Sequence, residues 1–146
     1  EKNEVEAAQL YKIAADKNCA AAIRNLGTMY EDGRGVQQKY SEALKCYERA
    51  AKLGDSDAMV YAGLMHEFGK GLEIHFSLAA KCYKSAIKRG NPNGMIGFGR
   101  LVEKSKTGKN AIEEALKYYQ MAIDVGSADA KLVYDSLVER ASKLSQ

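Results

Sequence analysis

The chain has 146 residues, enough for one domain, with 46% apolar residues, 28% charged residues and a formal net charge of +3. A charge this small and dispersed does not by itself indicate nucleic-acid binding, and no stretch approaches the roughly 20 apolar residues that span a bilayer. Three cysteines without a CxxC pair disfavour a disulfide scaffold or a zinc site, and they favour a reducing, cytoplasmic setting.

The N-terminal end carries no visible secretory signal, and the first residue is Glu1 rather than methionine. We therefore expect the sequence to be a processed product or an excerpt of a longer protein. If an upstream signal peptide was removed, the lumen of the secretory pathway is the alternative location.

Five series of identical residues recur along the chain at one period of 36 residues, without an insertion. Two of the series are glycines, two are alanines and one is tyrosine: Gly27, Gly63 and Gly99; Gly54, Gly90 and Gly126; Ala7, Ala43, Ala79 and Ala115; Ala14, Ala50, Ala86 and Ala122; Tyr11, Tyr47, Tyr83 and Tyr119. A fixed period of this length is typical of a solenoid built from two-helix repeats.

The predicted elements follow from this register in chain order. Residues 1–18 are interpreted as the second helix of a truncated repeat, and we expect further repeats to precede residue 1 in the full protein. Full repeats occupy 19–54, 55–90 and 91–126. Residues 127–146 form a C-terminal cap, with one helix over 128–144. The sequence thus predicts about eight helices in a right-handed, all-α solenoid that forms a single domain.

Within each full repeat, the first helix carries an apolar stripe at helical spacing and the second helix presents small residues and one tyrosine. In the first full repeat the two sets are Ile23, Leu26, Gly27 and Tyr30, followed by Ala43, Tyr47 and Ala50. Glycines fall just past the second helix of each full repeat and past the first helix of the first two, where a left-handed residue caps the last carbonyl groups. Asn18 takes that position in the truncated repeat.

Gly27 stands inside a predicted helix, where glycine costs roughly 1 kcal/mol relative to alanine. Because its equivalents recur on the packed stripe, we expect them to allow close approach to the alanine-rich second helix. Glycine then stands inside the helix because the packing requires it, and not because it takes part in a reaction.

The last predicted helix differs from the others on the face that would meet a following helix. Lys131 stands there in place of the apolar residue of the earlier repeats and Asp135 in place of the helical glycine, and their spacing suits an i,i+4 ion pair in water. The opposite face stays apolar through Val133, Tyr134, Leu137, Ala141 and Leu144. This pattern indicates a helix that ends the solenoid.

The segment AIRNLGTMYEDGRGVQQKYSEALKCYERAAKLG (22–54) resembles a Sel-1-like repeat, a relative of the tetratricopeptide repeat. The matching positions are Leu26, Gly27, Tyr30, Gly33, Gly35, Val36, Ala43, Tyr47, Ala50, Ala51 and Gly54. The resemblance covers essentially the whole chain. It weakens in the third repeat, where EKSKTGKNA replaces the Gly-x-Gly-Val turn. It implies a right-handed α/α superhelix that acts as an adaptor between proteins and is not generally catalytic.

The first helices of a two-helix solenoid line its concave wall. The candidate partner-binding residues lie on their face opposite the packing stripe: Arg24, Asn25, Thr28, Val60, Tyr61, Leu64, Phe68, Ile96 and Arg100. The helix of the second repeat is apolar nearly all round, which a merely solvated wall does not require. We predict a groove that buries apolar side chains of a peptide, while the arginines and Asn25 hold backbone or carboxylate groups. The alternative is that some of these residues pack against neighbouring first helices.

Other polar and sulfur-containing residues favour structural interpretations. Cys46 and Cys82 occupy equivalent positions and suit small packing residues. Cys19 lies near a turn, where it could be exposed and oxidisable. His66 takes a core position, with no second ligand at i±4, and His75 falls in a loop.

The segment SKTGKN does not fit a phosphate-binding loop, because Glu103 and Asn110 stand where a glycine and a Ser or Thr are needed. Lys104, Lys106 and Lys109 form either a small basic edge or, as we favour, a solvated loop without stacking aromatics. No catalytic constellation, metal site or cofactor is indicated.

Three functions remain open at this point. The first is a non-enzymatic adaptor that binds a peptide or partner surface on its concave wall. The second is a structural unit that self-associates into a homo-oligomer. The third and most remote is a hydrolase on a solenoid scaffold.

Overall fold

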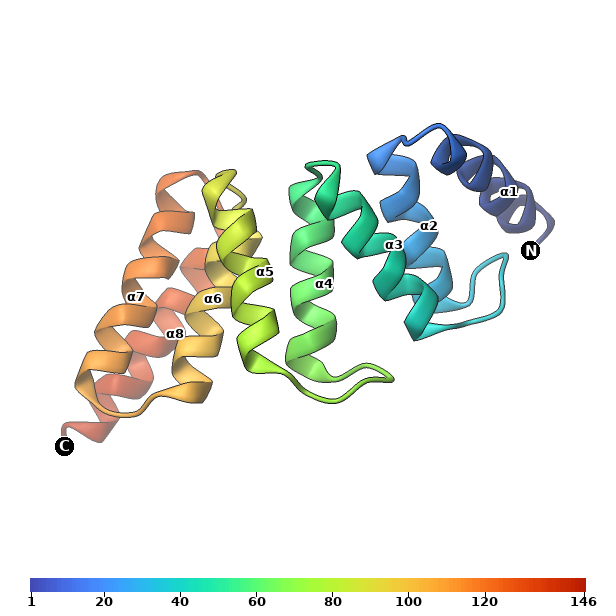
Figure 1. Cartoon of the computed structure of the whole chain (residues 1–146). Coiled ribbons are helices and arrows are strands. Elements are labelled where there is room, and N and C mark those ends of the chain that lie inside the picture. The colour runs from blue at the N-terminus through green and yellow to red at the C-terminus, as the bar shows by residue number, and fades with distance from the viewer.

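The computed structural model describes all 146 residues and contains eight α-helices and no strand (Figure 1). The helices are α1 (Lys2–Asp16), α2 (Ala20–Asp32), α3 (Tyr40–Lys52), α4 (Ser56–Phe68), α5 (Phe76–Lys88), α6 (Pro92–Ser105), α7 (Lys109–Asp124) and α8 (Ala128–Leu144). The predicted all-α solenoid is confirmed.

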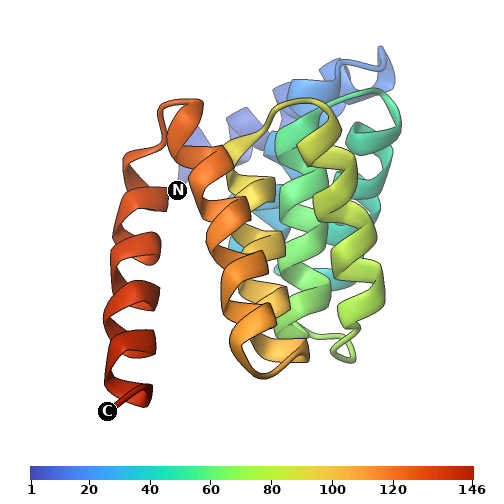
Figure 2. The same ribbon diagram turned by 90° about the vertical axis from the view of Figure 1, so that its left-hand side faces the viewer.

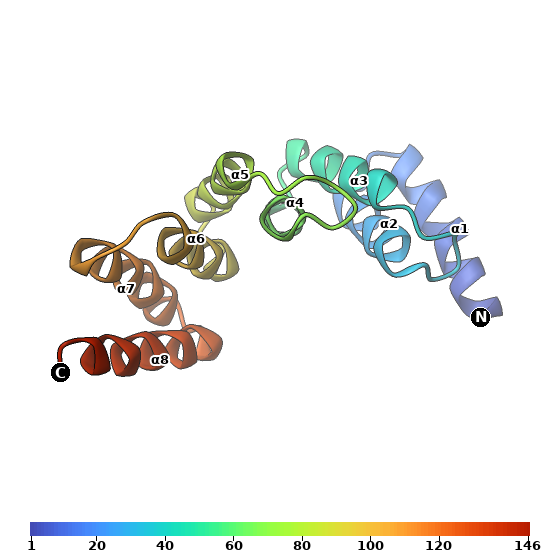
Figure 3. The ribbon, with the colours of Figure 1, turned by 90° about the horizontal axis from the view of Figure 1, so that it is seen from below.

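Consecutive helices pack against each other along the whole chain, and the two termini lie at opposite ends (Figure 1). Seen from below, the helices follow an arc. The inner side is formed by α2, α4, α6 and α8, and the outer side by α3, α5 and α7 (Figure 3). Viewed from the C-terminal end, α7 and α8 stand in front of the earlier helices (Figure 2). The inner helix α6 also contacts both α4 and α8.

The helix ends follow the predicted capping pattern. Gly33 ends α2 with φ +68°, and its backbone N–H donates to the carbonyl of Met29. After α1, Asn18 adopts φ +58°, because asparagine tolerates the left-handed region better than most residues. The loop between α6 and α7 differs from the equivalent loops of the two earlier repeats. Lys106, directly after α6, is extended, whereas Gly33 and Gly69 are left-handed at that position.

The buried residues form one large cluster and two small ones. The large cluster of 16 residues runs through α4–α8, and two clusters of four residues each lie in the N-terminal half. The periodic alanines and tyrosines of α3, α5 and α7 are almost fully buried in these clusters: Ala43, Tyr47, Ala50, Ala79, Tyr83, Ala86, Ala115, Tyr119 and Ala122.

The periodic helical glycines Gly27, Gly63 and Gly99 lie against a tyrosine ring of the alanine-rich second helix, in keeping with the expected close approach of the two helices. A Cβ atom on Gly27 would lie 2.7 Å from Cε1 of Tyr47, and one on Gly63 would lie 2.7 Å from Cε1 of Tyr83. The packing reason therefore holds, but the group that needs the space is the tyrosine side chain of the following helix.

The C-terminal helix α8 has the polar outer face that the sequence predicts. Lys131 Nζ lies 3.2 Å from Asp135 Oδ2, with both side chains exposed. Leu137 is buried on the opposite face, whereas Leu144 lies exposed at the end of the helix. No helix in the chain is long and apolar enough to cross a membrane.

Candidate functional site

Each periodic tyrosine packs against the inner helix that follows it in the chain. The residue 14 positions after the tyrosine stands on that inner helix, and its type differs from repeat to repeat. The ring of Tyr61 packs on Tyr47, with the ring centroids 5.3 Å apart and tilted by 41°. At the equivalent position Gly97 leaves no room for a side chain, since a Cβ atom would lie 2.5 Å from Tyr83 Cε1. Position 25 carries asparagine.

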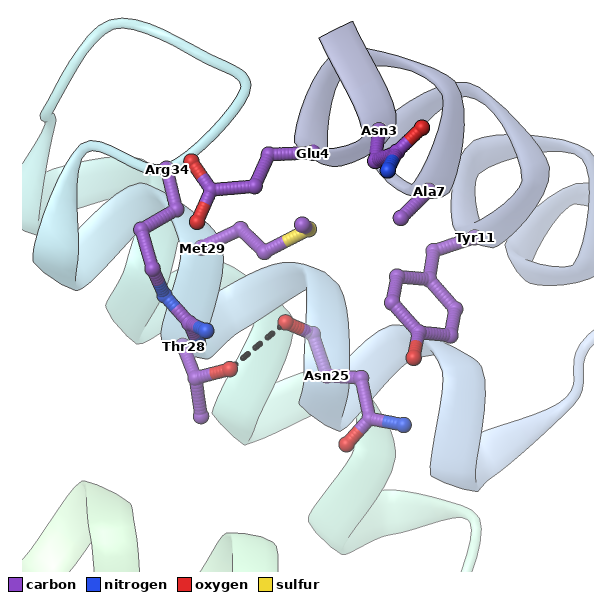
Figure 4. A pocket seen from close by; sticks show the side chains of 8 residues that line it. All are labelled: Asn3, Glu4, Ala7, Tyr11, Asn25, Thr28, Met29 and Arg34. Carbon is purple, nitrogen blue, oxygen red and sulfur yellow. Dashed lines mark hydrogen bonds between the residues drawn. The ribbon is translucent and has the colours of Figure 1, made fainter. Parts of the chain in front are cut away.

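A polar pocket of about 320 Å³ lies beside Asn25, which is the equivalent, one repeat earlier, of the larger Tyr61. It is lined by Asn3, Glu4, Ala7, Tyr11, Asn25, Thr28, Met29 and Arg34. Figure 4 shows the Tyr11 ring directed from α1 toward Asn25 on α2. The Thr28 hydroxyl donates to the Asn25 carbonyl at 2.7 Å. The structure thus brings the predicted residues Asn25 and Thr28 together in a hollow that offers hydrogen-bonding groups.

The middle of the wall, on α4, is apolar and aromatic. The exposed fractions are 36% for Tyr61 and 49% for Phe68, while Leu64 is half-buried against the main cluster. The expectation that Val60 and Ile96 line the open groove is corrected, because both are buried in the core. Part of the all-round apolarity of α4 is therefore explained by packing against α6.

Arg24 joins two repeats and is not free to hold a ligand. Its Nη1 lies 2.8 Å from Asp55 Oδ2 and 3.4 Å from Asp57 Oδ2. Asp55 is also the N-cap of α4, where its side chain accepts from the Ala58 N–H at 2.9 Å. Asn91, at the start of α6, donates to Asp57 at 2.8 Å. This chain of contacts fixes the N-terminal ends of three inner helices.

Arg100 belongs to a buried cluster centred on Glu67, whose side chain is 0% exposed. Glu67 accepts from the Tyr83 hydroxyl at 2.5 Å, from Arg100 Nε and Nη2 at 2.6 and 2.7 Å, and from Lys104 Nζ at 2.9 Å. Burial alone would raise the pKa of Glu67, but the hydrogen bonds from these three residues outweigh it and hold the pKa below its usual value. Glu67 is therefore ionised at neutral pH.

Phe68 lies beside the two cations of this cluster. Lys104 Nζ is 4.3 Å from the ring centroid, and Arg100 Cζ is 5.4 Å from it. Both distances fall within the range of a cation–π interaction. An exposed aromatic ring and two basic groups thus meet on the inner wall between α4 and α6.

The same arrangement of tyrosine and glutamate recurs in the neighbouring repeats. Tyr47 donates to Glu31 at 2.6 Å, and Lys70 Nζ lies 2.6 Å from the same carboxylate. Tyr119 donates to Glu103, and Arg140 lies 2.9 Å from it. Burial and the adjacent carboxylate raise the pKa of each tyrosine, so each hydroxyl stays protonated.

Sequence reasoning missed these glutamates, although the signal was present. Glu31, Glu67 and Glu103 recur at the 36-residue period, 16 residues before the periodic tyrosines. A carboxylate four residues after the helical glycine faces the same tyrosine, because residues i and i+4 share one face of a helix.

The remaining candidates have structural surroundings. His66 is nearly buried, and burial lowers its pKa. Burial raises the pKa of Cys46 and Cys82 to about 11, which makes these thiols poor nucleophiles. Cys19 is exposed. No group of three His, Cys, Asp or Glu side chains is arranged to hold a metal ion.

The basic edge divides between two surroundings. Lys106 pairs with Glu114 at 2.7 Å and Lys109 lies 3.8 Å from Glu113, both on the exposed loop and the first turns of α7. Lys104 belongs instead to the Glu67 cluster.

Known proteins resemble this chain in sequence and in fold. The Sel1 repeat family matches residues 1–19, 20–55, 56–91 and 97–127. No curated protein matches the chain. The structure is similar to that of a Sel1 repeat protein from Oxalobacter formigenes, with a TM-score of 0.81 and 30% identity over 90% of this chain and 54% of that one.

Two further solved structures are similar. One is a protective antigen of uropathogenic Escherichia coli that displays an SLR fold, with a TM-score of 0.85 and 26% identity over 96% of this chain and 30% of that one. The other is the Helicobacter pylori cysteine rich protein B, with a TM-score of 0.66 and 21% identity over 90% and 95% of the two chains, a likeness of fold. The chain spans about half of the Oxalobacter protein and under a third of the Escherichia coli antigen. With four family matches that cover most of its length, the chain belongs to the Sel1 repeat family.

Proposed function

We propose that this chain is a protein-interaction scaffold whose inner wall binds a segment of a protein partner. The Sel1 repeat fold is a scaffold typical of protein–protein interaction and is generally not catalytic. The observation that carries the proposal is the exposure of Tyr61 and Phe68 in the middle of the inner wall. Aromatic side chains of this kind anchor many protein interfaces.

The position of these two residues distinguishes them from the other exposed apolar residues. Most of the others lie on the end helices or beside the turns: Val5, Leu10, Ile13, Leu53, Ile74, Val125, Leu132, Val138 and Leu144. Tyr61 and Phe68 instead lie on α4, a central helix with neighbours on both sides. An aromatic pair at the centre of a concave wall suits a bound segment that is covered from several sides.

The binding wall that the contacts support is smaller than the sequence-derived set. It comprises Asn25, Thr28, Tyr61, Leu64, Phe68 and Arg100. Val60 and Ile96 support it from beneath, and Arg24 holds the inner helices together. Asn25 and Thr28 supply hydrogen-bonding groups at one end, α4 supplies apolar area, and Arg100 supplies charge at the other end.

The test selects binders from a displayed library of random peptides with the full chain as target. The affinity of each selected peptide is then measured for Phe68→Ser and for Leu78→Ser. Leu78 is a matched control, because it is similarly exposed but lies on the outer helix α5. We expect Phe68→Ser to weaken binding at least tenfold, or about 1.4 kcal/mol, and Leu78→Ser to leave it unchanged. Peptides that respond only to Leu78→Ser would place binding on the outer face and overturn the proposal.

Self-association through the same wall is the alternative that this design separates. Light scattering over a concentration series reports the oligomeric state of the free chain. A dimer that Phe68→Ser dissociates would mean that a second copy occupies the wall. A monomer that binds selected peptides supports the adaptor function.

A further inference from the structure

Three equivalent clusters on the inner wall differ in their balance of charge. Glu31 is paired with one cation, Lys70, and Glu103 is paired with one cation, Arg140. Glu67 contacts two cations, Arg100 and Lys104. The central cluster is therefore the one in which positive charge exceeds negative charge.

The other groups on the two helices do not cancel this excess. The Tyr83 hydroxyl is neutral, because burial and the Glu67 carboxylate raise its pKa. The carboxylates on α4 and α6 are Asp57, Glu67 and Glu103. Asp57 contacts Arg24, and Glu103 contacts Arg140. One positive charge is thus left without a carboxylate partner from its own helices.

The excess charge is accessible from the inner side of the wall. The side chains of Arg100 and Lys104 are 31% and 36% exposed, whereas Glu67 is fully buried beneath them. A carboxylate that approaches from solvent therefore meets the cations before it meets Glu67. Donors remain for it, since an ammonium group has three N–H bonds and a guanidinium has five.

An exposed aromatic ring lies beside this charge in the central cluster and not in the first. Phe68 contacts both cations, and the equivalent position in the first full repeat carries Asp32. An apolar side chain next to the acidic group of a ligand would pack on the Phe68 ring. The central cluster combines charge with apolar surface, whereas in the first cluster this position is Asp32, a polar residue whose carboxylate lies 3.5 Å from Arg34 Nε.

We infer that Phe68, Arg100 and Lys104 form an anchor for an acidic side chain of the partner, with an apolar residue next to it in the partner sequence. This inference rests on the proposed function and adds the chemistry that the wall selects. Charge-assisted hydrogen bonds to a carboxylate are among the stronger polar contacts in proteins. A basic segment would be repelled from the same place, so the excess charge also selects against unsuitable partners.

The test uses two synthetic peptides of about ten residues, which in extended form reach roughly 35 Å. One peptide places glutamates beside leucines in a glycine and serine background, and the other has glutamine in place of each glutamate. Fluorescence anisotropy with the full chain measures both affinities. We expect the glutamate peptide to bind more tightly and to weaken as salt is raised, while the glutamine peptide shows no salt dependence.

Variants locate the charge effect. Lys104→Gln leaves Glu67 paired with a single cation, as Glu31 is, and keeps the contact between Arg100 and Glu67. It should lower the affinity for the glutamate peptide about two- to fivefold, as for a partly exposed ion pair, and should not change the affinity for the glutamine peptide. Lys104→Arg should restore binding. Lys106→Gln removes a charge from the adjacent loop, where Lys106 pairs with Glu114, and should have no effect.

The results separate this inference from the proposed function. If both peptides bind equally and both lose affinity in Phe68→Ser, the wall binds peptides but the acidic preference is wrong. If the glutamate peptide fails to bind while selected peptides still require Phe68, the inference is likewise overturned. A single-stranded oligonucleotide that binds in a Lys104-dependent manner, where the glutamate peptide does not, would assign the charge to phosphate.

Discussion

The Glu31 and Glu67 clusters are built on the same frame and present different surfaces. Each has a helical glycine, a tyrosine ring that fills the space above it, and a glutamate that accepts from the tyrosine hydroxyl. Around this frame, the first cluster has one lysine and the second has an arginine, a lysine and an exposed phenylalanine. The comparison indicates that the frame holds the helices together, while the residues around it differ from one repeat to the next.

The residue above the tyrosine differs between the two regions in a similar way. Tyr61 covers Tyr47 with a second ring, whereas Gly97 brings the backbone of α6 against Tyr83. Tyr83 is therefore enclosed by glycines of two inner helices, Gly63 and Gly97. We expect the region around Tyr83 to be the less tolerant of added volume.

The largest expected effect comes from adding a side chain to the frame. Gly63→Leu should lower the free energy of unfolding by about 1–3 kcal/mol or more, because the added atoms overlap the Tyr83 ring. Urea denaturation measures the change. The loss should shrink when Tyr83→Leu is combined with it, as a double-mutant cycle shows. A variant that unfolds at the same urea concentration as the parent would refute the packing account.

The two glutamates should differ when each loses its charge. Glu67→Gln should lower the free energy of unfolding by about 1–3 kcal/mol, because a fully buried acceptor of charged hydrogen bonds is changed. Glu31→Gln should cost less, since its side chain is partly exposed and pairs with an exposed lysine. The same denaturation measurement compares them. Equal losses would mean that burial does not distinguish the two clusters.

Acidification should remove the contribution that Glu67 makes to the stability of the fold. The pKa of Glu67 is lower in the folded chain than its ordinary value of about 4.3. Its contribution to stability is therefore complete above about pH 4.3 and is lost as the pH falls toward the folded pKa. The difference in unfolding free energy between the parent and Glu67→Gln should shrink over that range. A difference that is constant with pH would contradict the shifted pKa.

The smallest expected effect comes from the cation of the first cluster. Lys70→Gln removes an exposed partner of Glu31 and should change the free energy of unfolding by less than about 1 kcal/mol. Thermal unfolding at low and high salt checks this, since the small loss should vanish as salt screens the pair. A loss as large as that of Glu67→Gln would remove the distinction between the clusters.

The repeat could be read from the sequence because its signal is local and periodic. The helices, the capping position of Asn18 and the polar face of α8 all follow from residue spacing within one repeat. Contacts between repeats were harder to predict. Val60 and Arg100 both lie on the face expected for the wall, but Val60 is buried and Arg100 is partly exposed. That difference depends on how α6 packs against α4 and α5, where Gly97 of α6 lies against the Tyr83 ring of α5.

The ion-pair partners of the two candidate arginines were hard to predict for the same reason, because they lie in another repeat. Arg24 and Arg100 were both expected to hold ligand groups, yet their carboxylate partners lie 31 and 33 residues away in sequence. No spacing rule within a helix links residues so distant. The periodic glutamates could have been found, because they share the register of the glycines and tyrosines.

Backbone amide chemical shifts, which map a bound peptide onto the chain, test most directly whether the inner wall is the binding surface. On titration with a peptide selected for binding, we predict that the shifts concentrate on the inner wall at Tyr61, Leu64, Phe68 and Arg100. The outer residues Leu78 and Cys82 should not move. Shifts confined to the outer helices, with the α4 wall unchanged, would contradict the claim that the inner wall is the binding surface.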